Sequence, residues 1–160
     1  AAGDTYFSGK LLARLARLVQ IADELGESGE AYFKNMVERL ARRLEVWLKK
    51  DTQTPFVYDA TWGGLISCGC DFNDWGTPHC SNKVDPAELC PALQDGGGQL
   101  NYGNGVYNDH HFHYGYFVYS AAVLAKHRPS WERRWREQIL TMVRDYGNPS
   151  REDKFFPVAR

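Results

Sequence analysis

One carboxylate and three imidazoles fall within five consecutive residues of this sequence: Asp109, His110, His111 and His113. The chain has five histidines in all, so more than half of them lie beside a single aspartate. Such a group of side chains can hold a metal ion, transfer protons or line a ligand-binding cleft. It can also be purely structural, with Asp109 capping a helix and the histidines bonded to backbone carbonyls.

A metal site needs three convergent ligands and an open coordination position. Asp109, His110 and His113 have a spacing that allows this on one helix face, so a metal-dependent hydrolase or oxidase is one alternative. The sequence lacks H-E-x-x-H or a related zinc pattern, however. Acid–base chemistry instead needs a carboxylic acid whose pKa is raised by partial burial. If the substrate is a glycoside, that chemistry also needs a second carboxylate.

The overall composition describes a globular protein without a strong charge. The 160 residues include 19 basic and 20 acidic side chains, so neither nucleic acid nor an anionic membrane surface is an expected partner. The longest apolar run, near residues 116–125, is too short to cross a bilayer. Aromatic residues make up 14% of the chain, many of them in loop-like sequence. Such residues suit an amphipathic ligand such as a sugar ring.

All four cysteines lie in one polar stretch, at Cys68, Cys70, Cys80 and Cys90. Their spacing does not match the paired cysteines of zinc sites, so two disulfides are the favoured interpretation. Two pairings stay open: Cys68–Cys80 with Cys70–Cys90, or Cys68–Cys90 with Cys70–Cys80. Disulfides are typical of secreted proteins, and the stretch therefore predicts an extracellular location.

Helices must position the histidine cluster. Apolar residues recur at helical spacing over residues 5–25 and again over 33–48, which predicts an antiparallel helical hairpin over about residues 5–50. Residues 51–107 lose this period and predict a long irregular loop region containing the cysteines, with short strands around Trp62-Gly63-Gly64. An almost uniformly apolar helix and a one-sided helix then predict a second hairpin over about residues 108–147. The predicted fold class is mostly α, built from inner–outer helical hairpins as in an (α/α) toroid.

The segment YNDHHFHYGYFVYSAAVLA closely resembles the signature of glycoside hydrolase family 81, the endo-β-1,3-glucanases that cut laminarin-type glucans. Four further segments resemble the family in the expected order: DTYFSGKLLARLARLVQIADELG, TWGGLIS, DFN and GQLNYGNGVYNDHHFHYGY. The resemblance covers nearly the whole chain. It implies that residues 1–160 are part of the family's catalytic (α/α)6 barrel, and that the protein is secreted and associated with cell walls.

The resemblance also implies a mechanism and a site. Hydrolysis of β-1,3-glucan would proceed with inversion and without a metal or cofactor. Asp109 would be the general acid, with His111 and His113 lining the cleft beside it. Further glucan contacts implied by the resemblance are Asp4, Tyr6, Trp62, Asp71, Asn73, Asn104 and Tyr107. For each of these residues, packing in a loop or capping of a helix is an equally strong alternative to glucan contact.

The family's catalytic base is a glutamate in an E-S-S-S-E-like motif, and no such motif occurs in this chain. The late acids are expected on the outer helix or the tail: Glu132, Glu137, Asp145, Glu152 and Asp153. We therefore expect the isolated chain to be weakly active or inactive, with the base supplied by the remainder of the catalytic domain. A non-catalytic β-1,3-glucan-binding protein is the alternative from a different functional class.

Overall fold

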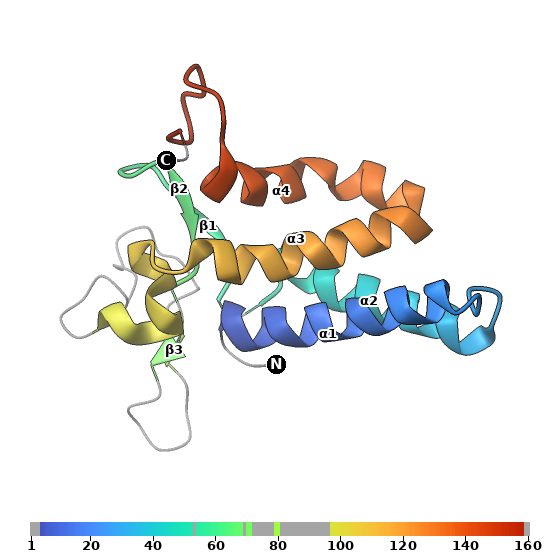
Figure 1. The fold of residues 1–160 in the computed structure, drawn as a ribbon. Helices are drawn as coiled ribbons and strands as arrows, with labels where there is room; N and C mark the ends of the chain where they lie inside the picture. The colour runs from blue at the N-terminus through green and yellow to red at the C-terminus, as the bar shows by residue number, and fades with distance from the viewer. Residues whose placement is uncertain (1–3, 53, 69, 72–78, 81–96, 159–160) are drawn as a thin grey trace.

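A computed structural model describes residues 4–52, 54–68, 70–71, 79–80 and 97–158. The predictions for Asn73 and Cys90 lie outside these residues, as do those for the side chains of Cys70, Asp71 and Cys80. Four α-helices make up most of the structure: α1 (Thr5–Glu24), α2 (Ala31–Leu48), α3 (His110–His127) and α4 (Pro129–Gly147). They form two antiparallel hairpins, α1–α2 and α3–α4 (Figure 1). The prediction of a mostly helical fold built from two such hairpins is confirmed.

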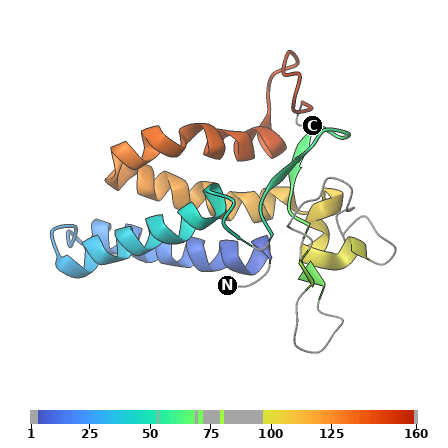
Figure 2. The same cartoon turned by 180° about the vertical axis from the view of Figure 1, so that it is seen from behind.

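The two hairpins pack so that α1 and α3 run side by side in the same direction (Figures 1 and 2). Helix α3 contacts α1, α2 and α4, which explains why its sequence is apolar almost all round. Because α1 and α3 are parallel, their N-termini lie at the same end of the molecule, beside the strands and the 3-10 helix (Figure 1). Asp109 and its neighbouring histidines lie at that end, at the start of α3.

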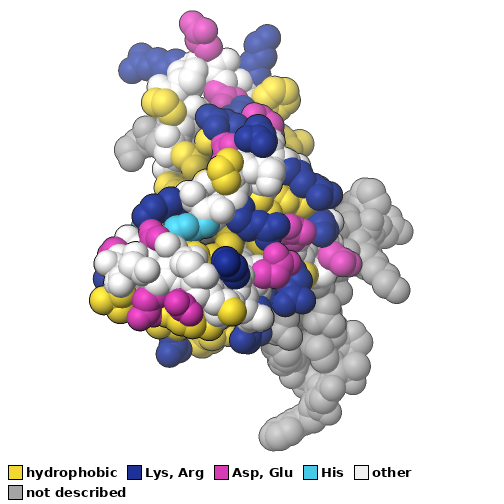
Figure 3. Space-filling view, turned by 90° about the vertical axis from the view of Figure 1, so that its right-hand side faces the viewer, with side chains coloured by type: hydrophobic (Ala, Val, Ile, Leu, Met, Phe, Trp, Pro, Cys, Tyr) yellow, Lys and Arg dark blue, Asp and Glu magenta, His cyan; other side chains and the backbone are white. Residues whose placement is uncertain are grey.

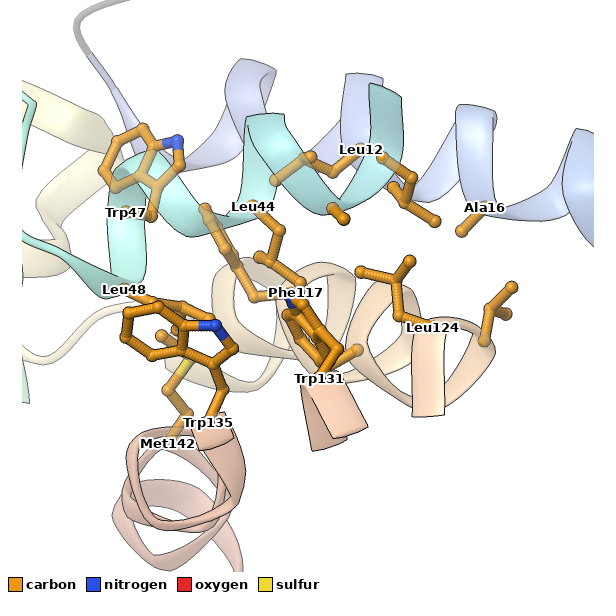
Figure 4. Packing of buried hydrophobic residues seen from close by; sticks show 14 of the residues in the cluster. Leu12, Ala16, Leu44, Trp47, Leu48, Phe117, Leu124, Trp131, Trp135 and Met142 are labelled. Carbon is orange, nitrogen blue, oxygen red and sulfur yellow. The ribbon is translucent and has the colours of Figure 1, made fainter. Parts of the chain in front are cut away.

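The hydrophobic core lies between the four helices (Figure 4). Phe117 and Leu124 of α3 are fully buried at its centre, and Leu44 of α2 packs beside them. Trp135 and Met142 close the core from α4. Close packing of this kind resists changes of even one methylene group, so the core holds α3 firmly relative to its neighbours.

A glycine sets the distance between α1 and α3. A Cβ atom added to Gly9 would lie 3.0 Å from the Cβ of Tyr116 and 3.1 Å from Cε2 of Phe117. The Cβ of Tyr116 is fixed to the backbone and cannot turn aside, so a side chain at position 9 would push the helices apart. Gly9 thus lets the N-terminal half of α1 approach the first turns of α3.

Short strands and a 3-10 helix occupy the described part of the predicted loop region. Strands β1 (Val57–Asp59) and β2 (Gly64–Ile66) pair antiparallel, with Tyr58 opposite Leu65. The turn between them contains Trp62, which confirms the strands expected there. A second antiparallel pair, β3 (Cys70–Asp71) and β4 (His79–Cys80), places Cys70 opposite Cys80.

Residues 97–106 differ from the prediction of an irregular loop, because they form the 3-10 helix η2 (Gly97–Val106). The four glycines and two asparagines of this segment favour turns, so the sequence predicts a loop here and gives no sign of a helix. Side-chain bonds of Asn101 and Asn104 hold the segment in place. The sequence contains these asparagines but does not indicate their partners.

Apolar side chains stay exposed along α1. Leu11, Leu18 and Leu25 recur every seven residues, which places them along one side of the helix and its C-cap. An exposed apolar stripe on this scale marks a surface that another element covers. Packing of further hairpins of the same domain against this surface stays a prediction.

The end of the molecule opposite Asp109 carries interspersed basic and acidic side chains (Figure 3). Ion pairs cross between the hairpins, with Lys126 Nζ 2.6 Å from Asp23 and Arg128 2.7 Å from Glu38. Exposed pairs of this kind contribute little to stability and leave a well-hydrated surface. None of the helices in the described part of the chain is long and apolar enough to span a membrane.

Candidate active site

Asp109 lies at the N-cap of α3, with φ 55° and ψ 25° in the left-handed region. Its backbone carbonyl accepts hydrogen bonds from the amides of Phe112 and His113, at 3.0 and 3.1 Å. Its carboxylate makes no capping hydrogen bond within the described structure, so the interpretation of Asp109 as a side-chain cap is wrong. Instead, Asn108 Nδ2 donates to Asp109 Oδ2 at 3.3 Å. The carboxyl group is exposed, so Oδ1 is accessible to a bound molecule.

His110 is buried in a network directly behind Asp109. Its Nε2 lies 2.8 Å from the Asn104 carbonyl oxygen, which can only accept a hydrogen bond, so Nε2 carries a hydrogen. Its Nδ1 lies 2.5 Å from Asp145 Oδ2, so a hydrogen bond joins the imidazole to the carboxylate. The other oxygen of Asp145 accepts from the Leu65 amide at 2.7 Å. This pair ties α3 to α4 and β2.

Tyr107 covers the network from the loop side. Its ring stacks on His110 with centroids 5.0 Å apart, and its hydroxyl donates to Asp59 Oδ2 at 3.0 Å. Burial, followed by the bond to Asp59, raises the pKa of Tyr107, so the hydroxyl stays a hydrogen-bond donor. Tyr107 has φ 65°, and its conformation directs the chain into Asp109. The residues on both sides of Asp109 are thus held by buried or half-buried partners.

His113 is fully buried on the opposite side, against the start of α1. Its Nδ1 lies 2.5 Å from Thr5 Oγ1. The Thr5 hydroxyl donates to Asn101 Oδ1 at 3.0 Å, so its oxygen accepts the hydrogen of His113 Nδ1. The Nε2 atom has no hydrogen-bond partner among the described residues. Burial, followed by the charge of His110, lowers the pKa of His113 to about 4, which keeps the ring neutral.

The neutral, buried state of His113 makes the protein sensitive to acid. Unfolded chains bind a proton at this residue below about pH 6.5, whereas the folded protein does so only below about pH 4. The contribution of His113 is therefore complete above pH 6.5 and is lost as the pH falls toward 4, by up to about 3 kcal/mol. Denaturant unfolding between pH 7 and 4 should show wild type losing its advantage over His113→Gln. His111→Gln, at an exposed neighbour, is the control, and a constant difference for His113→Gln would contradict the assignment.

The remaining predicted contact residues divide into accessible and inaccessible groups. His111 is exposed beside Phe112, and Trp62 is 74% exposed in the β1–β2 turn. Asn104 and His113 are fully buried, so neither presents a surface to a ligand in this structure, and we assign both a positioning role. Tyr6 is half-buried in a cluster of rings, and Asp71 lies on β3.

Asp4 has a helix-capping role, which is one of the alternatives to glucan contact that the sequence left open. It is the N-cap of α1, and its Oδ1 accepts from the Phe7 amide at 2.6 Å. Burial is the main influence on its carboxyl group and raises its pKa. A cap of this kind contributes about 1 kcal/mol to helix stability. Contact between Asp4 and a glucan stays a prediction.

The three residues considered as metal ligands do not converge. His110 is engaged by Asp145 and Asn104, while His113 is engaged by Thr5, on the other side of α3. Within the described residues, no group of three His, Cys, Asp or Glu side chains has the arrangement of a metal site. The arrangement instead presents one accessible carboxyl group on a rigid support, which suits proton transfer to a bound molecule.

Sequence reasoning missed Thr5, Asn101 and Asp145. Asp145 follows the buried Met142 by three residues and so lies on the inner face of α4, a signal that could have indicated its burial. The other late acids lie on α4 or in the tail as expected, and Asp153 pairs with Arg144. No local signal links Thr5 to Asn101, because they are 96 residues apart.

Comparison with known proteins gives a consistent result. A family model described as the Glycosyl hydrolase family 81 C-terminal domain matches residues 1–82 and 91–160. The chain is similar to a glucan endo-1,3-beta-D-glucosidase of Thermobifida fusca, with 35% identity over 99% of this chain and 18% of the relative. It is also similar to the primary septum glucan endo-1,3-beta-D-glucosidase of Schizosaccharomyces pombe, with 34% identity over 97% of this chain and 13% of that protein.

Solved structures agree with the sequence comparison. A glycoside hydrolase family 81 structure from Clostridium thermocellum matches with a TM-score of 0.62 and 28% identity, over 100% of this chain and 18% of that one. The chain thus spans less than a fifth of the length of each of these three relatives.

Proposed function

Because this chain belongs to glycosyl hydrolase family 81, we propose that it is a segment of an enzyme that hydrolyses internal linkages of β-1,3-glucan. One observation carries the proposal: the exposed carboxyl group of Asp109 at the start of α3, fixed from behind by a buried network. The relatives are named glucan endo-1,3-beta-D-glucosidases, which favours catalysis over glucan binding alone.

In the proposed reaction, Asp109 donates its proton to the glycosidic oxygen as the bond to the anomeric carbon breaks. A water molecule attacks that carbon from the opposite face of the sugar ring, and a second carboxylate takes the proton of the water. The product has the inverted anomeric configuration. In inverting enzymes the two carboxyl groups lie about 6.5–9.5 Å apart, which leaves room for the water.

The two oxygens of Asp109 have separate tasks in the proposed reaction. Oδ2 accepts a hydrogen bond from Asn108, so the transferable proton belongs on Oδ1. The base is proposed to come from outside residues 1–160. Among the acids on α4, Asp145 is buried in its pair with His110, and Glu132 is engaged by Arg136. The general-acid half of the reaction then resides in this chain, and the base half resides in the remainder of the domain.

The test is reducing-sugar release from soluble β-1,3-glucan by this chain and by a version extended beyond Arg160. We expect the extended protein to be active and the 160-residue chain to be weakly active or inactive. Proton NMR during the first minutes should show the α-anomer forming first. A β-1,4-glucan serves as the matched control substrate and should stay intact. No hydrolysis by either protein, or initial release of the β-anomer, would disprove the proposed reaction.

We further propose that the protein is secreted, acts at cell walls and contains two disulfides. Residues paired across antiparallel strands have Cα atoms about 4.5–5.5 Å apart, within the range that a disulfide spans. The register of Cys70 opposite Cys80 therefore favours the pairing Cys70–Cys80 with Cys68–Cys90. Cys68 is buried, which suits a structural rather than a reactive role. Peptide mapping without reduction tests this pairing, and recovery of Cys68–Cys80 would contradict it.

A further inference from the structure

We propose that Tyr102, supported by Tyr6 and Phe7, forms an aromatic subsite that receives one glucosyl ring of the glucan beside Asp109. This inference rests on the proposed function and adds a residue to it, since Tyr102 has no role in the mechanism above. It starts from Tyr102, a residue of η2 that is 47% exposed and lies at the same end of the molecule as the acid.

The backbone holds Tyr102 in an unusual conformation. Asn101 and Tyr102 have φ angles of 50° and 56°, so two consecutive residues with side chains occupy the left-handed region. Each such residue costs on the order of 1 kcal/mol or more, and strain of this kind collects at binding and catalytic sites. The strain persists because Asn101 is buried and bonded on both sides. Its Oδ1 accepts from the Thr5 amide at 2.8 Å, and its Nδ2 donates to the Ser67 carbonyl at 3.0 Å.

The result is a cluster of rings at the surface. The Tyr102 ring lies 4.9 Å from the Tyr6 ring and 5.9 Å from the Phe7 ring, measured between centroids. Phe7 is also 47% exposed, whereas Tyr6 is half-buried between the two. Lys10 lies 5.2 Å from the centre of the Tyr6 ring and adds a hydrogen-bond donor at the rim. Rings with a polar rim suit a ligand that has apolar C–H faces and hydroxyl edges, which describes a glucosyl residue.

Asn108 places this cluster next to the acid. Its Nδ2 donates to the Tyr102 carbonyl at 3.0 Å and to Asp109 Oδ2 at 3.3 Å. One nitrogen therefore contacts both residues, and the backbone of Tyr102 lies within two hydrogen-bond lengths of the carboxyl group. A sugar ring bound at Tyr102 would belong to the same glucan chain as the linkage that Asp109 protonates. Because Asn108 contacts both Tyr102 and Asp109, one bound glucan chain can reach the aromatic subsite and the acid together.

The experiment measures affinity for a β-1,3-linked glucose hexamer by calorimetry. The parent protein carries Asp109→Asn, and so does every variant, so that no hydrolysis occurs. Tyr102→Leu removes the ring and keeps a side chain with the same left-handed strain. We expect it to weaken binding by about tenfold or more, as loss of a ring contact would. Tyr102→Phe and Tyr102→Trp keep a ring and should bind within about twofold of the parent.

Tyr32→Leu is the matched control, because Tyr32 is 45% exposed and lies in the first turn of α2, at the end of the bundle away from Asp109. Its affinity should equal that of the parent, and thermal unfolding should show that all variants are folded. Unchanged affinity of Tyr102→Leu, or a lower unfolding temperature with unchanged affinity, overturns the subsite but not the proposed function. Absence of binding by the parent, together with absence of hydrolysis by the extended protein, overturns both.

Discussion

Asp109→Asn is expected to abolish reducing-sugar release by the extended protein, with a loss of roughly 10²–10⁴-fold, the usual contribution of a general acid. The amide is similar in size to the carboxyl group but has no proton to donate to the departing oxygen. The glycosidic bond would then have to break without protonation. Initial rates on soluble β-1,3-glucan measure the effect.

The fold of this variant should be unchanged. The Asp109 side chain is exposed and makes no capping bond within the described structure, so the amide disturbs little. Asp51→Asn changes another exposed aspartate, beyond the C-terminus of α2, and should keep full activity. Hexamer affinity should survive in both variants. Substantial hydrolysis by Asp109→Asn would refute the acid assignment, while binding without hydrolysis by any version would favour the glucan-binding alternative.

Asp145→Ala is expected to reduce the free energy of unfolding by about 3–5 kcal/mol, the cost of breaking a buried charged pair from one side. The Asp145 side chain is 2% exposed and its two oxygens have different partners. Its removal leaves His110 Nδ1 and the Leu65 amide without their acceptor. Urea unfolding at pH 7 measures the loss.

Two comparisons separate this pair from general damage to α4. Glu137→Ala removes an exposed carboxylate from the same helix and should change stability by less than about 0.5 kcal/mol. His110→Ala should also be strongly destabilising. The double variant should lose clearly less than the sum of the two single losses, because both remove one interaction. Additive losses, or a loss below about 1 kcal/mol for Asp145→Ala, would show that the pair is not a structural tie.

Local patterns in the sequence were sufficient for the helices. The apolar period of α1, α2 and α4 reports which side of each helix faces the core, and the uniform apolarity of α3 reports burial on several sides. The β1–β2 turn could likewise be expected, because Gly63 adopts φ 74° between two short β-prone runs. These features depend on residues a few positions apart.

The support of the site could not be predicted in the same way. His110 and Asp145 are 35 residues apart, and Thr5 and His113 are 108 residues apart. In neither pair does the sequence around one residue indicate which distant residue it bonds to. The left-handed conformations of Asn101, Tyr102 and Asp109 also have no reliable signal, since residues with side chains seldom adopt them and tertiary bonds impose them here.

The same long-range bonds determine when the site forms. Each helical hairpin can assemble from contacts between residues close in the chain, which is a fast process. The bonds of Thr5 to Asn101 and His113 require the closure of loops of 96 and 108 residues, and that entropic cost is met only after the helices have packed. The end that holds Asp109 is therefore expected to be the last part of the chain to fold, so a newly made molecule becomes competent to bind only after its helical body is complete.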